Sequence, residues 1–260
     1  MKHLLKLEGM PRRAMEEILA SAEAVKAKRG GGETKPLDGQ TWAMVFTKSS
    51  TRTRVSFEVG IRELGGAVMF LNANDLQLGR GEPIKDTARV LGRMVHGAVI
   101  RTYAQADVEE FAEYSGIPTI NALTDDEHPC QILTDIFTFQ ERRGPIRGKV
   151  VTYIGDGACN VPVSWVHAAA ALDFELRIAA PAEFQPSAET LAKAGGHIVC
   201  TEDVRSAVEG ADMVYTDVWV SMGMEAEAEA RLAKLAGYQI NGGLMRLAKP
   251  AALVMHCLPA

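Results

Sequence analysis

The chain contains 260 residues, 47% of them hydrophobic, which exceeds the usual size of one domain and predicts two. Its net charge is −5, and it contains no block of lysine or arginine. This excludes a basic surface for binding nucleic acid or an anionic membrane and favours a small-molecule partner. Its four cysteines lack Cys-x-x-Cys spacing and no stretch reaches about 18 apolar residues, so we expect a cytosolic protein without disulfides, structural zinc or a membrane span.

Apolar runs of strand length recur along the chain and alternate with amphipathic segments of helix length. An opening helix starts near Pro11, and Gly30-Gly31-Gly32 then indicates a loop. The runs predicted as strands are Trp42–Phe46, Ala67–Leu71, Ala98–Ile100, Val150–Ile154, Leu176–Ala179, Ile198–Cys200, Met213–Tyr215 and Ala252–Met255. This alternation predicts an α/β fold in which parallel sheets are flanked by helices.

The regular alternation breaks once, near the middle of the chain. A long helical stretch from Pro129 to Arg142 is followed by Arg143-Gly144-Pro145, which stops a helix and precedes a new strand. We therefore predict an N-terminal domain of residues 1–143 and a C-terminal domain of residues 144–260. Because ligands of open α/β sheets bind beyond the carboxyl ends of the strands, where the polar motifs of this chain fall, an active site in the cleft between the two domains is expected.

The first polar motif is Ser50-Thr51-Arg52-Thr53-Arg54, which follows the first predicted strand and precedes a helical segment. Free backbone N–H groups and the positive end of the dipole at a helix N-terminus favour an anion, and the hydroxyls and a guanidinium add directed donors. This pattern predicts a phosphate site, although no Gly-x-x-x-x-Gly-Lys sequence is present and a P-loop is excluded. The alternative is a capping hydroxyl followed by two solvent-facing arginines.

Two further motifs belong to the first half. Arg101 follows the third strand and would bring a second guanidinium to the same edge of the sheet, unless it pairs with a surface carboxylate. His128 precedes Pro129 at the start of the long helix, and the helix terminus and two arginines favour a neutral imidazole that polarises a carbonyl by donating a hydrogen bond. A capping histidine without chemistry is the alternative.

The second half carries weaker signals. Gly155-Asp156-Gly157 follows a strand but lacks the third glycine of a dinucleotide fingerprint, so a nicotinamide-dependent oxidoreductase is only a distant alternative. Asn160 is positioned to hold a substrate carboxylate or amine, or to cap a helix. Asp217 opens a loop with a glycine that could close over a cationic substrate, or is an ordinary capping residue. Cys257 ends the last strand, where its thiol could relay a proton near Asp217 or be buried and inert.

Four ordered motifs, Ser50 to Arg54, His128 to Gln131, Asp217 to Gly223 and His256-Cys257-Leu258-Pro259, closely resemble the aspartate/ornithine carbamoyltransferase family along the whole chain. The Ser-Met-Gly loop and His-Cys-Leu-Pro resemble its ornithine branch. The resemblance implies transfer of the carbamoyl group from carbamoyl phosphate to the δ-amine of L-ornithine, which gives L-citrulline and phosphate. It also implies that no metal or organic cofactor is needed.

The resemblance assigns roles residue by residue. The residues implied for carbamoyl phosphate are Ser50, Thr51, Arg52, Thr53, Gln77, Arg101, His128, Gln131, Cys257 and Leu258. Those implied for ornithine are Asn160, Asp217, Ser221 and Met222. Among these, Arg52, Arg101 and His128 would stabilise developing negative charge, and Asp217 and Cys257 would position and deprotonate the amine. Gln77 matches a residue that reaches into a neighbouring subunit's site, which implies a homotrimer or a multiple of it, and Arg54 is taken as structural.

The sequence departs from the family pattern at its end. The chain stops at Ala260, whereas this family normally continues through a substrate-binding arginine and a terminal helix that packs on the first domain. A truncated subunit that binds but does not react is therefore one alternative. A carbamoyltransferase for a related amine or amino acid, such as putrescine or N-acetylornithine, is another.

Overall fold

A computed structural model describes residues 1–31, 35–72, 81–220 and 225–260. It forms two compact units: unit 1 comprises Met1–Leu7 and Arg13–Cys130, and unit 2 comprises Glu8–Arg12 and Gln131–Ala260. The division falls in the first turn of helix α5 (Pro129–Arg143), whereas the predicted domain boundary lies at the end of that helix. Because a connecting helix can be counted with either side, the boundary after residue 143 stays a prediction.

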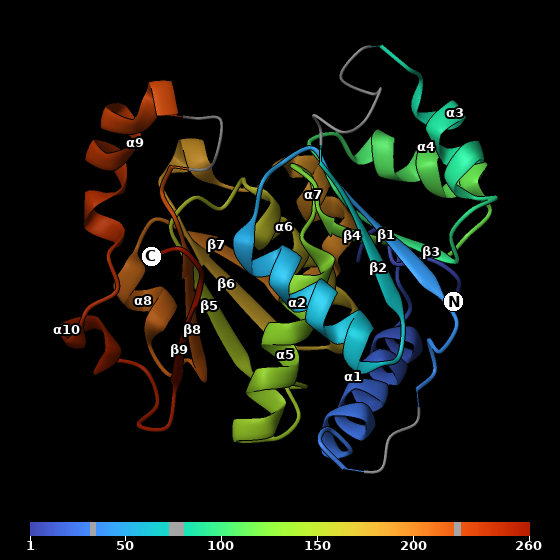
Figure 1. The fold of residues 1–260 in the computed structure, drawn as a ribbon. Helices are drawn as coiled ribbons and strands as arrows, with labels where there is room; N and C mark the ends of the chain where they lie inside the picture. The colour runs from blue at the N-terminus through green and yellow to red at the C-terminus, as the bar shows by residue number, and fades with distance from the viewer. Residues whose placement is uncertain (32–34, 73–80, 221–224) are drawn as a thin grey trace. The chain divides into compact units, whose positions relative to one another are not determined.

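Unit 1 is built on a four-stranded parallel sheet in the order β2-β1-β3-β4 (Figure 1). Its strands are β1 (Thr41–Phe46), β2 (Ala67–Asn72), β3 (Gly97–Arg101) and β4 (Thr119–Leu123). Its helices are α1 (Arg12–Ala27), which begins in unit 2, α2 (Thr51–Glu63), α3 (Ile84–Leu91) and α4 (Gln105–Ser115). The predicted strands of this half are confirmed, and β4 is an additional strand that the apolar pattern did not predict.

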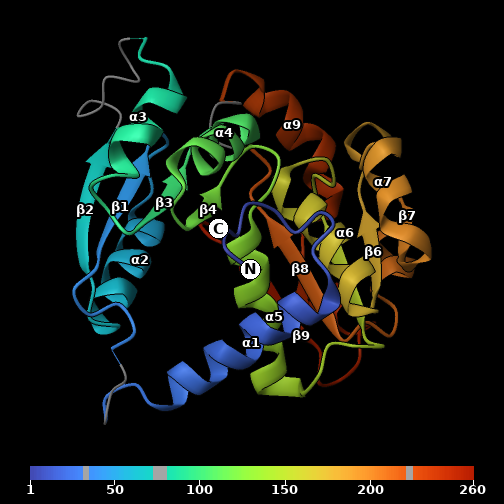
Figure 2. The same cartoon turned by 90° about the vertical axis from the view of Figure 1, so that its right-hand side faces the viewer.

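The central strands of unit 1 are covered on both faces. Val45 and Ile100 pack with α3 and α4 on one face, whereas Met44 and Phe46 pack with α2 on the other (Figure 2). Every residue of β3 is buried. Continuous apolar runs of this kind are expected for parallel strands that lie between two helical layers.

The N-terminal residues extend the sheet beyond β4. Leu4 forms a parallel bridge with Ile120, its N–H donates to the carbonyl of Thr119 at 2.9 Å, and its carbonyl accepts from Asn121 N–H at 2.7 Å. The Asn121 amide also donates to the carbonyl of Leu5 at 2.8 Å. These bonds satisfy the edge of β4, which would otherwise expose unpaired backbone groups.

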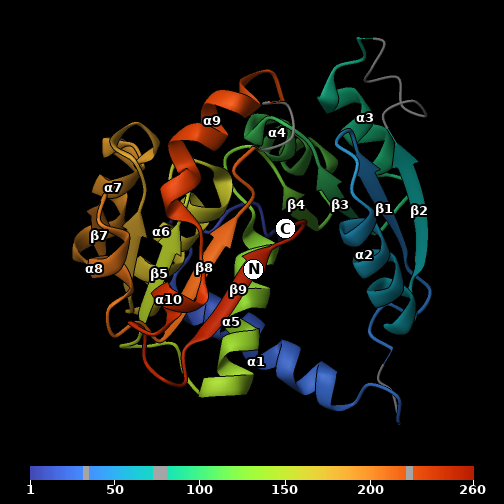
Figure 3. The ribbon, with the colours of Figure 1, turned by 90° about the vertical axis from the view of Figure 1, so that its left-hand side faces the viewer.

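Unit 2 contains a five-stranded parallel sheet in the order β7-β6-β5-β8-β9 (Figure 3). Its strands are β5 (Val150–Ile154), β6 (Glu175–Ala179), β7 (Ile198–Thr201), β8 (Met213–Asp217) and β9 (Leu253–Cys257). Besides α5, its helices are α6 (Asn160–Leu172), α7 (Ala188–Ala194), α8 (Val204–Val208), α9 (Ala228–Leu235) and α10 (Gly242–Met245). Short 3₁₀ turns are η2 (Ala182–Phe184), η3 (Gly195–His197), η4 (Glu225–Glu227) and η5 (Ala236–Tyr238). All of the strands predicted in this half are present.

The core of unit 2 lies on both faces of its sheet. On one face Ile154 and Val214 pack with α8 and α10. On the other face the ring of Trp165 from α6 contacts the ring of Tyr215 with centroids 5.3 Å apart, and Tyr153 stacks on Tyr215 at 6.2 Å. Among the helices of the described residues, none has the length and apolar content needed to cross a bilayer.

Candidate active site

Three neighbouring strands of unit 1 end at the same edge of the sheet. Phe46 at the end of β1 lies opposite Arg101 at the end of β3, and Arg101 lies opposite Leu123 at the end of β4. Because all three strands run parallel, the segments that follow them share one edge. The sheet therefore places the motif starting at Ser50, Arg101 and the loop leading to His128 at the carboxyl end of one sheet, as the sequence predicted.

The N-terminus of α2 forms the centre of this edge. Ser50 is the cap residue, and its hydroxyl accepts from the Thr53 N–H at 3.3 Å and donates to the Thr53 hydroxyl at 2.9 Å. Arg101 donates from Nη1 to the same Thr53 hydroxyl at 3.3 Å. The cap and the guanidinium thus lie in direct contact, which is the arrangement of an anion site at a helix terminus. Thr51 and Arg52, in the first turn, are exposed.

Arg54 contacts two neighbouring side chains of unit 1. Its guanidinium carbon lies 3.7 Å from the centroid of the Phe70 ring, and its Nε lies 3.7 Å from Glu58 Oε2. A cation over an aromatic face is a stabilising contact that fixes the arginine on the protein surface. These contacts agree with the structural role expected for Arg54.

Lys48 is a site residue that sequence reasoning missed. Its side chain is only 7% exposed, its ammonium lies 2.8 Å from an Asp125 carboxylate oxygen, and it lies 5.0 Å from the centroid of the Tyr103 ring. The available signal was a lysine placed two residues after the apolar run of β1. A buried ammonium at this edge adds positive charge beside Arg101 and favours an anionic ligand.

His128 is buried and neutral. Burial, followed by the positive charges of Arg101 and Lys48, lowers its pKa to about 3. The sequence predicted the neutral imidazole but attributed it to the helix terminus and to Arg52 with Arg101. The structure corrects this cause, since burial has the largest effect and Lys48 supplies the second charge. A neutral imidazole keeps one N–H that can donate to a carbonyl oxygen.

The second predicted group of residues lies at the carboxyl edge of the unit 2 sheet. Asp217 at the end of β8 is paired with Cys257 at the end of β9, and the two strands lie side by side in Figure 3, so the two residues are neighbours in the sheet. Asn160 opens α6 after β5, which pairs with β8. These three side chains therefore belong to adjacent strand ends of one sheet.

Asp217 is a buried carboxyl group at the end of a central strand. It is 9% exposed, and its Oδ1 accepts from the Val218 N–H at 2.7 Å. Burial, with smaller contributions from Asp156 and Asp135, raises the pKa of Asp217 to about 7. A carboxyl group with such a pKa exchanges a proton near neutrality and gains charge when a cationic amine binds beside it.

A buried ion pair connects the strand ends of unit 2 to α9. Arg231 contacts the carboxylate of Asp156 and donates from Nε to the carbonyl of Trp219 at 2.9 Å. The side chains of Arg231 and Asp156 are 9% and 5% exposed. Nothing in the sequence pointed to Arg231, because its partners come from segments distant along the chain. This pair fixes the start of the loop that follows β8.

Gln131 and Asp135 lie one turn apart on α5. The Gln131 amide nitrogen donates to both oxygens of Asp135 at 3.1 Å, and the Tyr215 hydroxyl donates to Asp135 Oδ2 at 2.6 Å. Burial raises the pKa of Asp135 to about 6, although both hydrogen bonds oppose this. The sequence assigned Gln131 to the site but missed Asp135, for which the i,i+4 spacing from Gln131 was the available signal.

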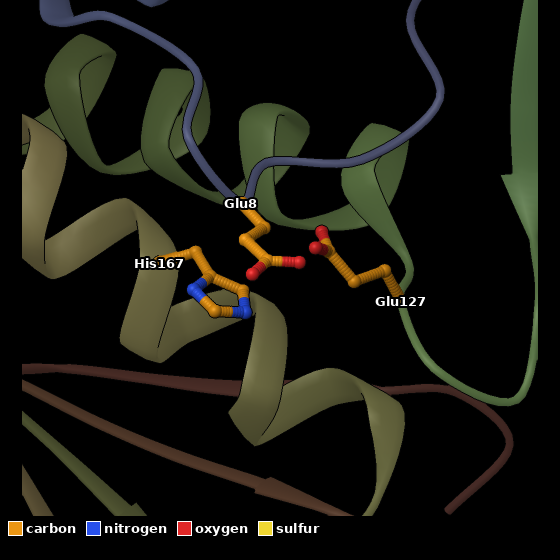
Figure 4. Close-up of side chains that lie close together, drawn as sticks. All are labelled: Glu8, Glu127 and His167. Carbon is orange, nitrogen blue, oxygen red and sulfur yellow. The ribbon is translucent and has the colours of Figure 1, made fainter. Parts of the chain in front are cut away.

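Figure 4 shows a further pair of polar side chains in unit 2, with the Glu8 carboxylate beside the His167 imidazole of α6. Glu8 also lies 2.8 Å from the Lys193 ammonium. Glu127, labelled in the same figure, belongs to unit 1, where it accepts from the Leu7 N–H at 2.6 Å. Two ligands within one unit are too few to hold a metal ion, so no cation is assigned to them.

Four of the predicted site residues are not among the side chains placed above. Gln77, Ser221 and Met222 lie outside the described residues. Leu258 directly follows β9 and is 56% exposed. Within the described ranges, the structure therefore gathers the predicted phosphate residues in unit 1 and Asn160, Asp217 and Cys257 in unit 2.

Comparisons with known proteins cover both units of the chain. The model of the carbamoyl-P binding domain of aspartate/ornithine carbamoyltransferases matches residues 2–141, and that of the Asp/Orn binding domain matches residues 147–260. The ornithine carbamoyltransferase of Akkermansia muciniphila is 52% identical, with 100% of this chain and 86% of the relative covered. The anabolic enzyme of Pseudomonas aeruginosa is 48% identical, with 100% and 85% covered. The ornithine carbamoyltransferase structure from Pyrococcus furiosus has a TM-score of 0.92 and 44% identity, covering 100% of this chain and 85% of that one. The chain belongs to the aspartate/ornithine carbamoyltransferase family.

Proposed function

We propose that this protein transfers the carbamoyl group of carbamoyl phosphate to the δ-amine of L-ornithine, forming L-citrulline and inorganic phosphate. The observation that carries this proposal is the contact of the buried Arg101 with the Ser50-capped terminus of α2, within a chain whose named relatives are ornithine carbamoyltransferases. A phosphate fits this terminus because backbone N–H groups, hydroxyls and a guanidinium converge there.

The first part of the proposed mechanism concerns the leaving group. Ser50, Thr51, Arg52 and Thr53 bind the phosphate, and Arg101 bridges the phosphate and the carbonyl oxygen. All of them act as donors to oxygens whose negative charge grows as the bond to phosphate breaks. One preorganised donor of this kind is typically worth about 3 kcal/mol of barrier.

The second part concerns the carbamoyl group and the amine. The neutral imidazole of His128 donates to the carbonyl oxygen, and Gln131 holds the carbamoyl nitrogen. Asn160 and Asp217 hold ornithine in unit 2, and Cys257 lies beside the attacking amine. The amine must lose a proton from a pKa close to that of lysine, about 10.4, before it can attack the carbamoyl carbon. Asp217, whose pKa is raised to about 7, is suited to receive that proton.

Further elements of the proposal come from the family resemblance alone. Ser221, Met222 and Leu258 are assigned to the substrates, and Gln77 to the site of a neighbouring subunit, which implies a trimer or a multiple of it. Two other parts of the proposal come from the sequence pattern: a domain boundary after residue 143, at the helix stop Arg143-Gly144-Pro145, and a cytosolic location. The anabolic relative of Pseudomonas aeruginosa favours a role in arginine biosynthesis.

Citrulline formation tests the proposal directly. Purified protein is given ornithine and carbamoyl phosphate, and Arg52→Ala is compared with Arg62→Ala, a matched change of an exposed arginine on the same helix whose partner is Glu58 at 3.0 Å. We expect turnover by the parent and by Arg62→Ala, and a loss of at least about 100-fold in Arg52→Ala. Absence of turnover in the folded parent, or equal rates in both variants, would refute the proposal.

A further inference from the structure

The amide of Gln131 has only one orientation that suits its surroundings. Its neighbour on α5, Asp135, is 6% exposed, and one amide atom of Gln131 lies 3.1 Å from both Asp135 oxygens. An ionised carboxylate only accepts hydrogen bonds, so the atom that faces it must be the NH₂ group. The reverse orientation would place the amide oxygen against two carboxylate oxygens. The network therefore fixes the assignment of amide oxygen and nitrogen.

Tyr215 forms a second hydrogen bond to the Asp135 carboxylate, in addition to the bonds from Gln131. Its hydroxyl donates to Asp135 Oδ2 at 2.6 Å from a ring that is fully buried. The ring itself is confined by Tyr153, stacked at 6.2 Å, and by the edge of Trp165 at 5.3 Å. Because this hydroxyl donates to it, the carboxylate of Asp135 acts as the acceptor in both bonds. The side chains of Asp135 and Tyr215 thus form a rigid support beneath Gln131.

We propose that Asp135 and Tyr215 are positioning residues that hold the carbonyl oxygen of Gln131 toward the ligand, so that the site selects an acyl phosphate bearing an N–H donor over one bearing a methyl group. This inference rests on the proposed function and deepens it. Once the NH₂ of Gln131 is bound to Asp135, only the oxygen Oε1 remains to contact a ligand. The carbamoyl group presents NH₂ to that acceptor, whereas the acetyl group of acetyl phosphate presents a methyl group of similar size.

The expected discrimination follows from the cost of an unpaired acceptor. A ligand without the matching N–H leaves Oε1 without its hydrogen bond in a partly buried position, which lowers affinity about tenfold or more. Asp135→Asn reverses the constraint, because the Tyr215 hydroxyl donates to the amide oxygen of the new side chain and the NH₂ of that side chain then faces Gln131. The Gln131 amide therefore turns its oxygen toward position 135 and its NH₂ toward the ligand. The variant should lose affinity for carbamoyl phosphate while its affinity for acetyl phosphate stays nearly constant.

The test measures KM for carbamoyl phosphate, KM for ornithine, and the inhibition constant of acetyl phosphate in citrulline formation at pH 8. In Asp135→Asn we expect KM for carbamoyl phosphate to rise about tenfold, with less than about a twofold change in the other two constants. Tyr215→Phe, which removes a single hydroxyl, should shift the same ratio in the same direction by a smaller factor. Equal changes for carbamoyl and acetyl phosphate would overturn the proposal, since a merely structural role affects both ligands alike.

A paired exchange supplies the rescue experiment. In the double variant Gln131→Glu with Asp135→Asn, the amide introduced at position 135 donates to the carboxylate introduced at position 131, whose second oxygen again faces the ligand as an acceptor. The net charge of the pair is unchanged, and we expect the preference for carbamoyl phosphate to return to within about threefold of the parent. Gln131→Glu alone places two carboxylates together and should not show the preference. A paired variant no better than either single change would overturn the inference, whereas inactivity of the parent would instead refute the proposed function.

Discussion

The substitution Arg231→Met tests how much the buried ion pair between Arg231 and Asp156 stabilises unit 2. The change removes the guanidinium but keeps an apolar stem of similar length, and it leaves Asp156 with the Ala158 N–H at 3.0 Å as its remaining partner among the described residues. Because the Asp156 side chain is 5% exposed, its charge cannot be hydrated in place. Breaking a buried pair from one side costs about 3 to 5 kcal/mol. For a chain of this size the cost corresponds to a fall in Tm of about 6 to 20 °C.

The assay is urea unfolding at pH 7 combined with thermal melting, and α9 supplies its own control. Lys234, on the same helix, pairs with Glu183 at 2.6 Å, but the two side chains are 48% and 52% exposed. Lys234→Met should therefore cost less than about 1 kcal/mol. The double variant Arg231→Met with Asp156→Asn also removes the carboxylate charge that the single variant leaves buried. Its free energy of unfolding should exceed that of Arg231→Met by at least about 2 kcal/mol. If Arg231→Met and Lys234→Met cost the same, the reasoning from burial is wrong.

Two further predictions concern titration and packing. Burial raises the pKa of Asp217 from 3.8 to about 7, so the folded state binds the proton more tightly and this residue's contribution to stability falls as pH rises between those values. Asp217→Asn removes that effect, so its free energy of unfolding in urea should exceed that of the parent by up to about 4 kcal/mol at pH 8 and by less than about 1 kcal/mol at pH 4. Equal values at pH 8 would contradict the assignment. A Cβ at Gly97 would lie 2.6 Å from the Trp42 ring, so Gly97→Ala should lower the free energy of unfolding by about 1 to 3 kcal/mol. Gly60 lies in α2 with open space around it, so Gly60→Ala should raise the free energy of unfolding by about 0.5 to 1 kcal/mol. Equal thermal shifts for the two alanines would argue against the close approach at Gly97.

The parts of the fold that the sequence predicts best are the parallel strands with continuous apolar runs. The strand Val150–Ile154 has the bounds that its apolar run predicts, because alternate residues pack on different helical layers and both sets must be apolar. The missed strand β4 contains Asn121, which is fully buried yet polar. Its amide donates to the backbone of Leu5, a partner 116 residues earlier. A local pattern cannot reveal that a buried polar residue is satisfied by so distant a segment.

The candidate site shows the same limit. Ser50, Arg101 and His128 stand next to strand ends, where topology alone brings residues together. Lys48 and Arg231 act through Asp125 and Asp156, and such pairings depend on three-dimensional packing that one sequence does not display. Gly157 fits a nucleotide motif only in part, and a Cβ there would lie 2.7 Å from the Ile178 side chain. Close packing of that loop against β6 accounts for the glycine without any nucleotide.

The short segment Glu8–Arg12 has a consequence for dissecting the protein. The chain leaves unit 1 after Leu7, returns to it after Arg12, and leaves it again after Cys130. Within unit 2, Arg12 donates to the carbonyl of Ala171 at 2.9 Å and lies 3.6 Å from Asp173. A fragment that starts at Gln131 lacks these bonds, so no single backbone cut yields unit 2 intact. Expressing it alone would require grafting this short segment back by circular permutation or adding it as a separate peptide.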